Sequence, residues 1–149
     1  MCYNTYMKYF LMLIAVVLVA VGVAIFTKKP VQAPVVVNPQ PLQYKDLVYV
    51  EIPLSGTKVT SPLVVSGRAR GNWYFEASFP VKLLDGNGNQ IAIAPAQAIG
   101  NWMTTDYVPF SVTLTFPTPA TATGTLILQK DNPSGEPQFD DSVSIPVTF

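Results

Sequence analysis

No histidine occurs among the 149 residues, and the single cysteine, Cys2, lies outside the part of the chain that could fold. Without histidine, the chain has neither the commonest general base nor the commonest metal ligand. One cysteine allows no disulfide within the chain and no cysteine-rich zinc site. GxSxG motifs and glycine-rich phosphate loops are also absent. We therefore expect a protein that is not an enzyme and that uses no cofactor.

Charged residues are few, and nine basic side chains balance nine acidic ones. The balance conceals an asymmetry, because the chain from Leu47 onward carries eight acidic and five basic side chains, a net charge of −3. A mildly acidic surface argues against a nucleic-acid partner.

Charge is missing altogether from residues 9–26, which read YFLMLIAVVLVAVGVAIF. At a rise of about 1.5 Å per residue, a helix of this length nearly spans a hydrocarbon core of about 30 Å. The run is longer than the apolar region of a usual signal peptide, about 7–15 residues. We predict a short tail at 1–8 and an uncleaved transmembrane helix at 9–26, with a cleaved signal sequence as the alternative. The flanking lysines do not decide the orientation.

Proline dominates the next segment, with four prolines and no glycine between Pro30 and Asp46. Proline fixes φ and removes a backbone donor, so this segment is expected to be extended and without regular structure. We assign 27–46 to a Pro-rich linker and 47–149 to a folded domain.

From residue 47 onward, apolar and polar residues alternate with a period of two, as in Val48, Val50 and Ile52 and again along 63–70 and 108–116. This pattern is typical of strands with one buried face. Turn-forming residues separate the runs, and no long amphipathic helix follows Phe26. About seven such strands predict an all-β domain, an antiparallel β-sandwich without a disulfide.

The stretch SGRARGNWYFEASFPV, residues 66–81, has two interpretations. It can form a hairpin in which the arginines of one strand face Glu76 on the next, because opposite charges across a strand pair stabilise a sheet. It can also supply a partner-binding surface, because Arg, Trp and Tyr are the residues that most often dominate interfaces. The residues proposed for that surface are Arg68, Arg70, Trp73, Tyr74 and Trp102.

Two acidic segments contain side chains that can bind a metal ion. Asp85, Asn87 and Asn89 have the spacing of the start of a calcium loop, but its twelfth position is Ala96 instead of a glutamate. We therefore predict a hairpin turn there. The second segment is interpreted as a solvated turn in preference to a cation site; its acidic residues are Asp131, Glu136, Asp140 and Asp141.

Three segments carry a family resemblance: SPLVVSGRARGNWYFEASFPVKLLDGNGNQIA at 61–92, GNWM at 100–103 and LILQKDNPSGEPQFDDSVSIPV at 126–147. Together they resemble the bacterial spore germination immunoglobulin-like domain over nearly all of 48–149. The resemblance implies an immunoglobulin-like sandwich outside the cytoplasmic membrane. It brings no reaction, ligand or functional residues.

The expected function is therefore that of a non-enzymatic, membrane-anchored extracytoplasmic module that binds an envelope protein or a cell-wall polymer. The alternative is a structural spacer or self-assembling envelope subunit without a specific ligand. The oligomeric state does not follow from the sequence.

Overall fold

The computed structural model describes Tyr6, Tyr9 and residues 41–149. The chain divides into two compact units, Met1–Val37 and Asn38–Phe149. Apart from Tyr9, the predicted transmembrane helix at 9–26 lies outside the described residues, as does most of the predicted linker. Among the residues described, no helix combines the length and the apolar character needed to cross a bilayer.

Residues 41–149 form an antiparallel β domain with two short 3-10 helices, η1 (Gly71–Trp73) and η2 (Pro137–Phe139). The confirmed all-β architecture contains eight strands instead of about seven. They are β1 (Leu42–Tyr44), β2 (Val48–Ile52), β3 (Leu63–Arg70), β4 (Ser78–Asp85), β5 (Gln90–Ala98), β6 (Tyr107–Leu114), β7 (Thr123–Gln129) and β8 (Ser142–Thr148).

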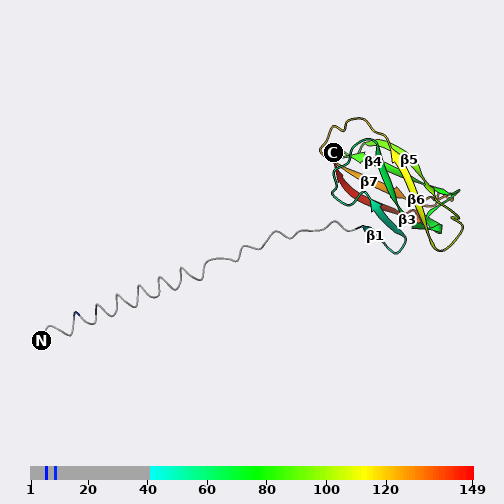
Figure 1. The fold of residues 1–149 in the computed structure, drawn as a ribbon, viewed down its shortest axis with the longest axis horizontal. Helices are drawn as coiled ribbons and strands as arrows, with labels where there is room; N and C mark the ends of the chain where they lie inside the picture. Colours follow the sequence, from blue (N-terminus) through cyan, green and yellow to red (C-terminus); the bar gives the residue numbers. More distant parts are fainter. Residues whose placement is uncertain (1–5, 7–8, 10–40) are drawn as a thin grey trace. The chain divides into compact units, whose positions relative to one another are not determined.

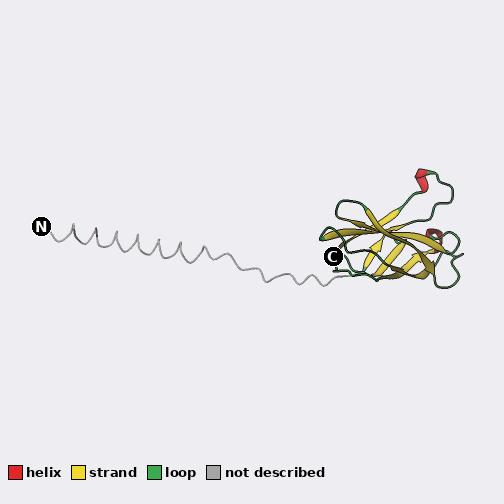
Figure 2. Ribbon diagram, turned by 90° about the horizontal axis from the view of Figure 1, so that it is seen from above, coloured by secondary structure: helices red, strands yellow, loops and turns green. Residues whose placement is uncertain are grey.

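The strands follow the order β1-β2-β3-β6-β5-β4-β7-β8 in one hydrogen-bonded sheet that folds back on itself. The fold line lies between β5 and β6, which share only the pairs Gln97↔Ser111 and Ala98↔Phe110. Two layers result, β1-β2-β3-β6 and β5-β4-β7-β8 (Figures 1 and 2). The opposite side is nearly closed, because the Val59 amide donates to the Thr148 carbonyl oxygen at 2.8 Å.

The core lies between the two layers and consists of the inward residues of each alternating strand. Along β3, buried and more exposed positions alternate without interruption, as the sequence period predicts. Aromatic side chains fill the centre. The Phe79 ring packs edge-on against Tyr74 at 5.2 Å and against Phe110 at 5.0 Å between centroids. Such edge-to-face pairs add stability beyond their buried area.

The predicted linker is wrong at its end, because Leu42–Tyr44 forms β1 and pairs with Val48–Val50 of β2. The Tyr44 ring also lies 6.3 Å from Trp73, centroid to centroid, in an edge-on arrangement. A strand of three residues is too short to show alternation in the sequence. It forms because β2 offers a free edge for hydrogen bonding.

The predicted hairpin between the arginine strand and the next strand is also wrong. β3 pairs with β2 and β6, whereas β4 pairs with β5 and β7. Arg68 and Arg70 therefore do not face Glu76, which lies in the loop after η1 with a φ of 49°. Alternation shows which face of a strand is buried, but it does not identify the neighbouring strand.

Candidate functional site

Four connections emerge at the same end of the sandwich, because consecutive neighbours in the sheet run antiparallel. They join β1 to β2, β3 to β4, β5 to β6 and β7 to β8, and we call this region the loop end. Its residues are 45–47, 71–77, 99–106 and 130–141. In sandwich domains of this general kind, loops gathered at one end are a common place for binding residues.

Backbone hydrogen bonds join these connections to one another. The Gly71 amide donates to the Asp106 carbonyl oxygen at 3.2 Å, and the Asp131 amide donates to the Trp73 carbonyl oxygen at 3.1 Å. A methyl group at Gly71 would collide with the carbonyl oxygens of Trp102 and Thr104. The close approach of the 99–106 loop to η1 therefore requires glycine at position 71.

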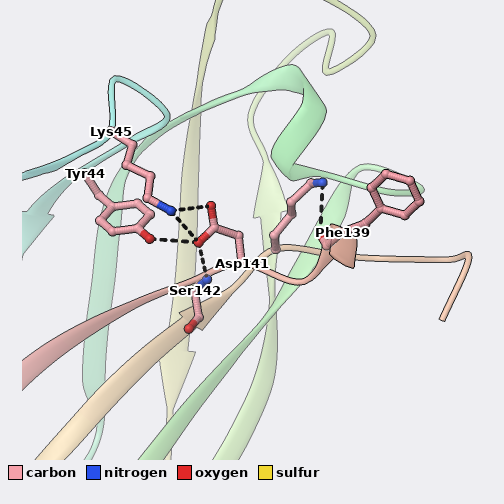
Figure 3. Close-up of polar contacts among 6 residues, drawn as sticks. Tyr44, Lys45, Phe139, Asp141 and Ser142 are labelled. Atoms are coloured by element: carbon pink, nitrogen blue, oxygen red, sulfur yellow. Dashed lines mark hydrogen bonds and ion pairs between the residues drawn. The ribbon is translucent and has the colours of Figure 1, made fainter. Parts of the chain in front are cut away.

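Asp141 connects the β7–β8 loop to β1 (Figure 3). The Tyr44 hydroxyl donates to Asp141 Oδ1 at 2.8 Å, and Lys45 Nζ lies 3.3 Å from Asp141 Oδ2. Burial alone would raise the pKa of Asp141, but the hydrogen bonds from Tyr44 and Lys45 outweigh it and lower that pKa. The Phe139 ring points away from Asp141 in the same view.

A second polar group secures the β1–β2 turn. Arg70 Nη2 donates to Asp46 Oδ2 at 2.8 Å, and the Tyr107 hydroxyl donates to Asp46 Oδ1 at 2.9 Å. These hydrogen bonds, that from Arg70 first, lower the pKa of the Asp46 carboxyl. The bonds to Asp46 and those to Asp141 together hold the β1–β2 and β7–β8 loops of the loop end against the neighbouring strands.

Large apolar side chains are exposed on the loop end. Met103 is 74% exposed, Ile99 60%, Phe139 51% and Phe75 40%. Seven large hydrophobic residues are exposed within 41–149, and four of them belong to the loop end. The other three lie elsewhere on the domain: Ile52, Val64 and Ile93. Because exposed apolar side chains are more frequent at interaction surfaces, the loop end is the candidate site of this domain.

The loop end is also acidic. It carries seven carboxylates, whereas its basic residues are only Lys45 and Lys130, with Arg70 at its border. Within 41–149 the two ion pairs are Lys45–Asp141 and Arg70–Asp46. The five carboxylates that form no ion pair there are Glu76, Asp106, Asp131, Glu136 and Asp140. In the part of the chain that the structure describes, no three acidic, cysteine or histidine side chains are grouped to hold a metal ion.

The structure separates the residues predicted for a partner-binding surface. Trp73 is fully buried and Tyr74 is 4% exposed, so the prediction that these two are surface residues is wrong. Both fill the core beneath the loop end, where the Tyr74 hydroxyl donates to the Val108 carbonyl oxygen at 2.7 Å and burial raises its pKa. Trp102 is half-buried against the core. Arg70 belongs to the Asp46 group, and Arg68 is exposed on β3.

Asp85 confirms the predicted hairpin turn between β4 and β5. Its Oδ1 accepts hydrogen bonds from the backbone amides of Asn87 and Asn89, each at 2.9 Å, and its Oδ2 accepts one from Asn89 Nδ2 at 3.0 Å. The carboxylate therefore stabilises the turn directly, as is common for aspartate at such positions.

Sequence reasoning missed the four exposed apolar residues. Ile99 and Met103 lie within the turn-forming segment IGNWM, and Phe139 lies two residues after Pro137 in a largely polar loop. An apolar residue among turn-forming residues is a usable signal for an exposed contact. Phe75 directly follows the buried Tyr74, and nothing in its immediate sequence distinguishes the exposed residue from the buried one.

The fold agrees with a comparison against known families. The family model of the immunoglobulin-like domain of bacterial spore germination matches residues 47–147. No curated protein and no solved structure matches the chain. The matched region covers more than half of the chain and contains seven of the eight strands, β2 to β8. This chain therefore belongs to the family of immunoglobulin-like domains of bacterial spore germination.

Proposed function

We propose that this protein is a non-enzymatic, membrane-anchored module that binds an envelope protein through its loop end, outside the cytoplasmic membrane. One observation carries the proposal: four of the seven large hydrophobic residues exposed within 41–149 lie on loops at one end of the sandwich. Single exposed apolar residues are ordinary, but their concentration on adjoining loops is a property of interaction surfaces.

The anchor and the location are supported by the sequence. Residues 9–26 are uncharged, apolar and long enough to span a bilayer. The family resemblance favours a domain on the outer side. An antiparallel sandwich connected to a membrane segment in this way can present its loops to other envelope components.

The composition of the loop end favours a protein partner over a cell-wall polymer. Phenylalanine, isoleucine and methionine side chains gain free energy by entering apolar pockets, which protein surfaces provide. Five carboxylates without ion partners would attract a basic surface and repel a polyanionic polymer. The matching partner surface therefore combines apolar pockets with lysine or arginine.

Site-specific photo-cross-linking in cells of the native host tests this proposal. A photoreactive amino acid replaces Met103 or Phe139 at the loop end, and Ile93 in the control chain, since this residue is also apolar and exposed but lies on β5, outside the loop end. We expect adducts with another envelope protein from the loop-end positions and none from the control.

Two results would contradict the proposal. Equal adducts from all three positions would show that exposure alone determines the cross-links. Adducts that contain only two copies of this chain would favour the alternative function, a self-assembling envelope subunit.

A further inference from the structure

Arg68 lies on the outer face of the β2-β3-β6 layer, near the end of β3 that adjoins the loop end, which begins three residues later at Gly71. It is paired in register with Tyr49 of β2 and Pro109 of β6. Its guanidinium carbon lies 4.4 Å from the centroid of the Tyr49 ring and 5.5 Å from that of Tyr107. A cation near two aromatic rings is attracted by both, so the position of this guanidinium is restricted before any ligand binds.

Arg70, the only other arginine of the chain, lies two residues along the same strand, and each of its three nitrogen atoms already donates a hydrogen bond. Its Nε donates to the Asp46 carbonyl oxygen at 3.1 Å, its Nη1 to the Thr105 carbonyl oxygen at 3.3 Å and its Nη2 to Asp46 Oδ2. Arg70 and Asp46 therefore cancel each other in charge.

Arg68 differs from Arg70 in this respect. Within residues 41–149 it forms no ion pair and donates no side-chain hydrogen bond, although it is exposed. The one carboxylate nearby on β2, Glu51, forms no ion pair with it. The guanidinium of Arg68 is therefore held in position while its N–H groups remain free in the described part of the chain. Two parallel N–H groups of a guanidinium can bind the two oxygens of an oxyanion at once.

We propose that Arg68 is a binding site for a single carboxylate, presented by a protein partner as an acidic side chain or a chain terminus. The charge pattern favours one carboxylate over a polyphosphate. Arg68 has no ionic partner within 41–149, Asp46 already balances the charge of the neighbouring Arg70, and the domain has a net charge of −3. The tyrosine rings and Pro109 beside it offer apolar contact to the rest of a peptide. The site borders the loop end but rests on different residues from the exposed apolar side chains that carry the proposed function, so its failure would leave that function standing.

The chain has just two arginines, so the signal of Arg70 can serve as the control for that of Arg68 in the same sample. In the full ¹⁵N-labelled chain in detergent micelles, NMR follows the Nε–Hε signals of Arg68 and Arg70 during titration with N-acetylglutamate amide. The neutral N-acetylglutamine amide serves as the matched control, and inorganic phosphate tests the other oxyanion. We expect a saturable shift of the Arg68 signal with the glutamate probe alone, while the Arg70 signal stays in place.

Variants test the part played by the rings. Tyr49→Leu removes the closer ring and is expected to weaken binding of the glutamate probe about two- to fivefold, whereas Tyr49→Phe keeps the ring and the affinity. The unchanged Arg70 signal reports that each variant is folded.

The proposal is overturned if both arginine signals shift together without saturation, because that response is general charge screening. Saturation by inorganic phosphate alone would also overturn it, as would equal affinity in the leucine and phenylalanine variants. The titration of the unmodified chain decides the question even if a variant does not fold.

Discussion

Three consecutive aromatic residues after Gly71 have different environments. Trp73 and Tyr74 are buried, whereas Phe75 is 40% exposed. Aromatic residues are common both in protein cores and at interfaces, so residue type alone does not tell which of the three are buried. The separation arises from the backbone, which forms η1 and then turns through positive φ values at Glu76 and Ala77. Burial of these residues could therefore not be predicted from their identity alone.

The substitution Tyr74→Phe is expected to lower the free energy of unfolding by about 1–2 kcal/mol, because the buried Val108 carbonyl oxygen loses its hydrogen bond of 2.7 Å from the Tyr74 hydroxyl. Tyr49→Phe is the control, since the Tyr49 hydroxyl donates no hydrogen bond to the described residues. Urea denaturation of both variants measures the difference. Equal unfolding midpoints for the two variants would contradict the prediction.

Elements with long, regular alternation could be predicted from the sequence, and short or irregular ones could not. β3, β6 and β8 alternate strictly, and each lies where the pattern indicates. β5 was not identified as a strand, since its segment QIAIAPAQA contains proline and several small residues. β1 was not identified because it has only three residues. The partner of a strand depends on whether the chain stays in one layer or crosses to the other, as it does between β3 and β4. The alternation pattern does not contain this information.

The β4–β5 turn has an expected pH dependence. Hydrogen bonds from Asn89 and then from the backbone lower the pKa of the Asp85 carboxyl. The folded pKa then lies below the unfolded value of about 3.9, so the unfolded state binds more protons between the two values. The stabilisation by Asp85 is therefore complete above the unfolded pKa and is lost as the pH falls through the folded pKa.

Asp85→Asn tests this dependence. The unmodified chain is expected to be more stable than the variant at neutral pH, and the difference is expected to shrink as the pH falls below about 4. Urea denaturation over a series of pH values measures it. A difference that stays constant down to the lowest pH would show that the charge of Asp85 is not involved.

The first strand gives a second prediction about elements. A fragment that begins at Leu47 lacks β1 and the bonds of Tyr44 and Lys45 to Asp141. It also lacks Asp46 with its bonds from Arg70 and Tyr107. Compared with the fragment Asn38–Phe149, it is expected to lose about 2 kcal/mol or more of unfolding free energy, because one partly buried hydrogen bond and the packing of Tyr44 on Trp73 disappear. Thermal melting of both fragments measures the loss. Identical melting temperatures would place the domain boundary at Leu47 after all.

At the scale of the whole molecule, the sequence predicted the sandwich and the family, and it predicted the candidate site only in part. Arg68 and Arg70 are surface residues as proposed, but the exposed apolar residues of the loop end were not foreseen. Their shared position depends on four connections that are distant in the sequence and meet because the strands run antiparallel. A local signal can indicate that a single loop residue is exposed, but that the four loops share one end is a consequence of the topology.

The location of the domain is the most direct test of the account, and the single cysteine of the chain makes it accessible. Cys2 precedes the apolar run 9–26, whereas Val64→Cys in a Cys2→Ser background places a thiol on the exposed face of β3, away from the loop end. Both chains are expressed in the native host and treated with a membrane-impermeant maleimide, with the outer layers permeabilised in parallel and a cytosolic protein as control. Labelling after detergent lysis shows that each thiol can react.

We predict that the Val64→Cys chain is labelled in cells whose cytoplasmic membrane is intact, and that Cys2 of the unmodified chain is labelled only after lysis. The reverse pattern, with Cys2 accessible and the Val64→Cys thiol protected, would place the domain in the cytosol. The proposal of an extracytoplasmic binding module would then have to be abandoned.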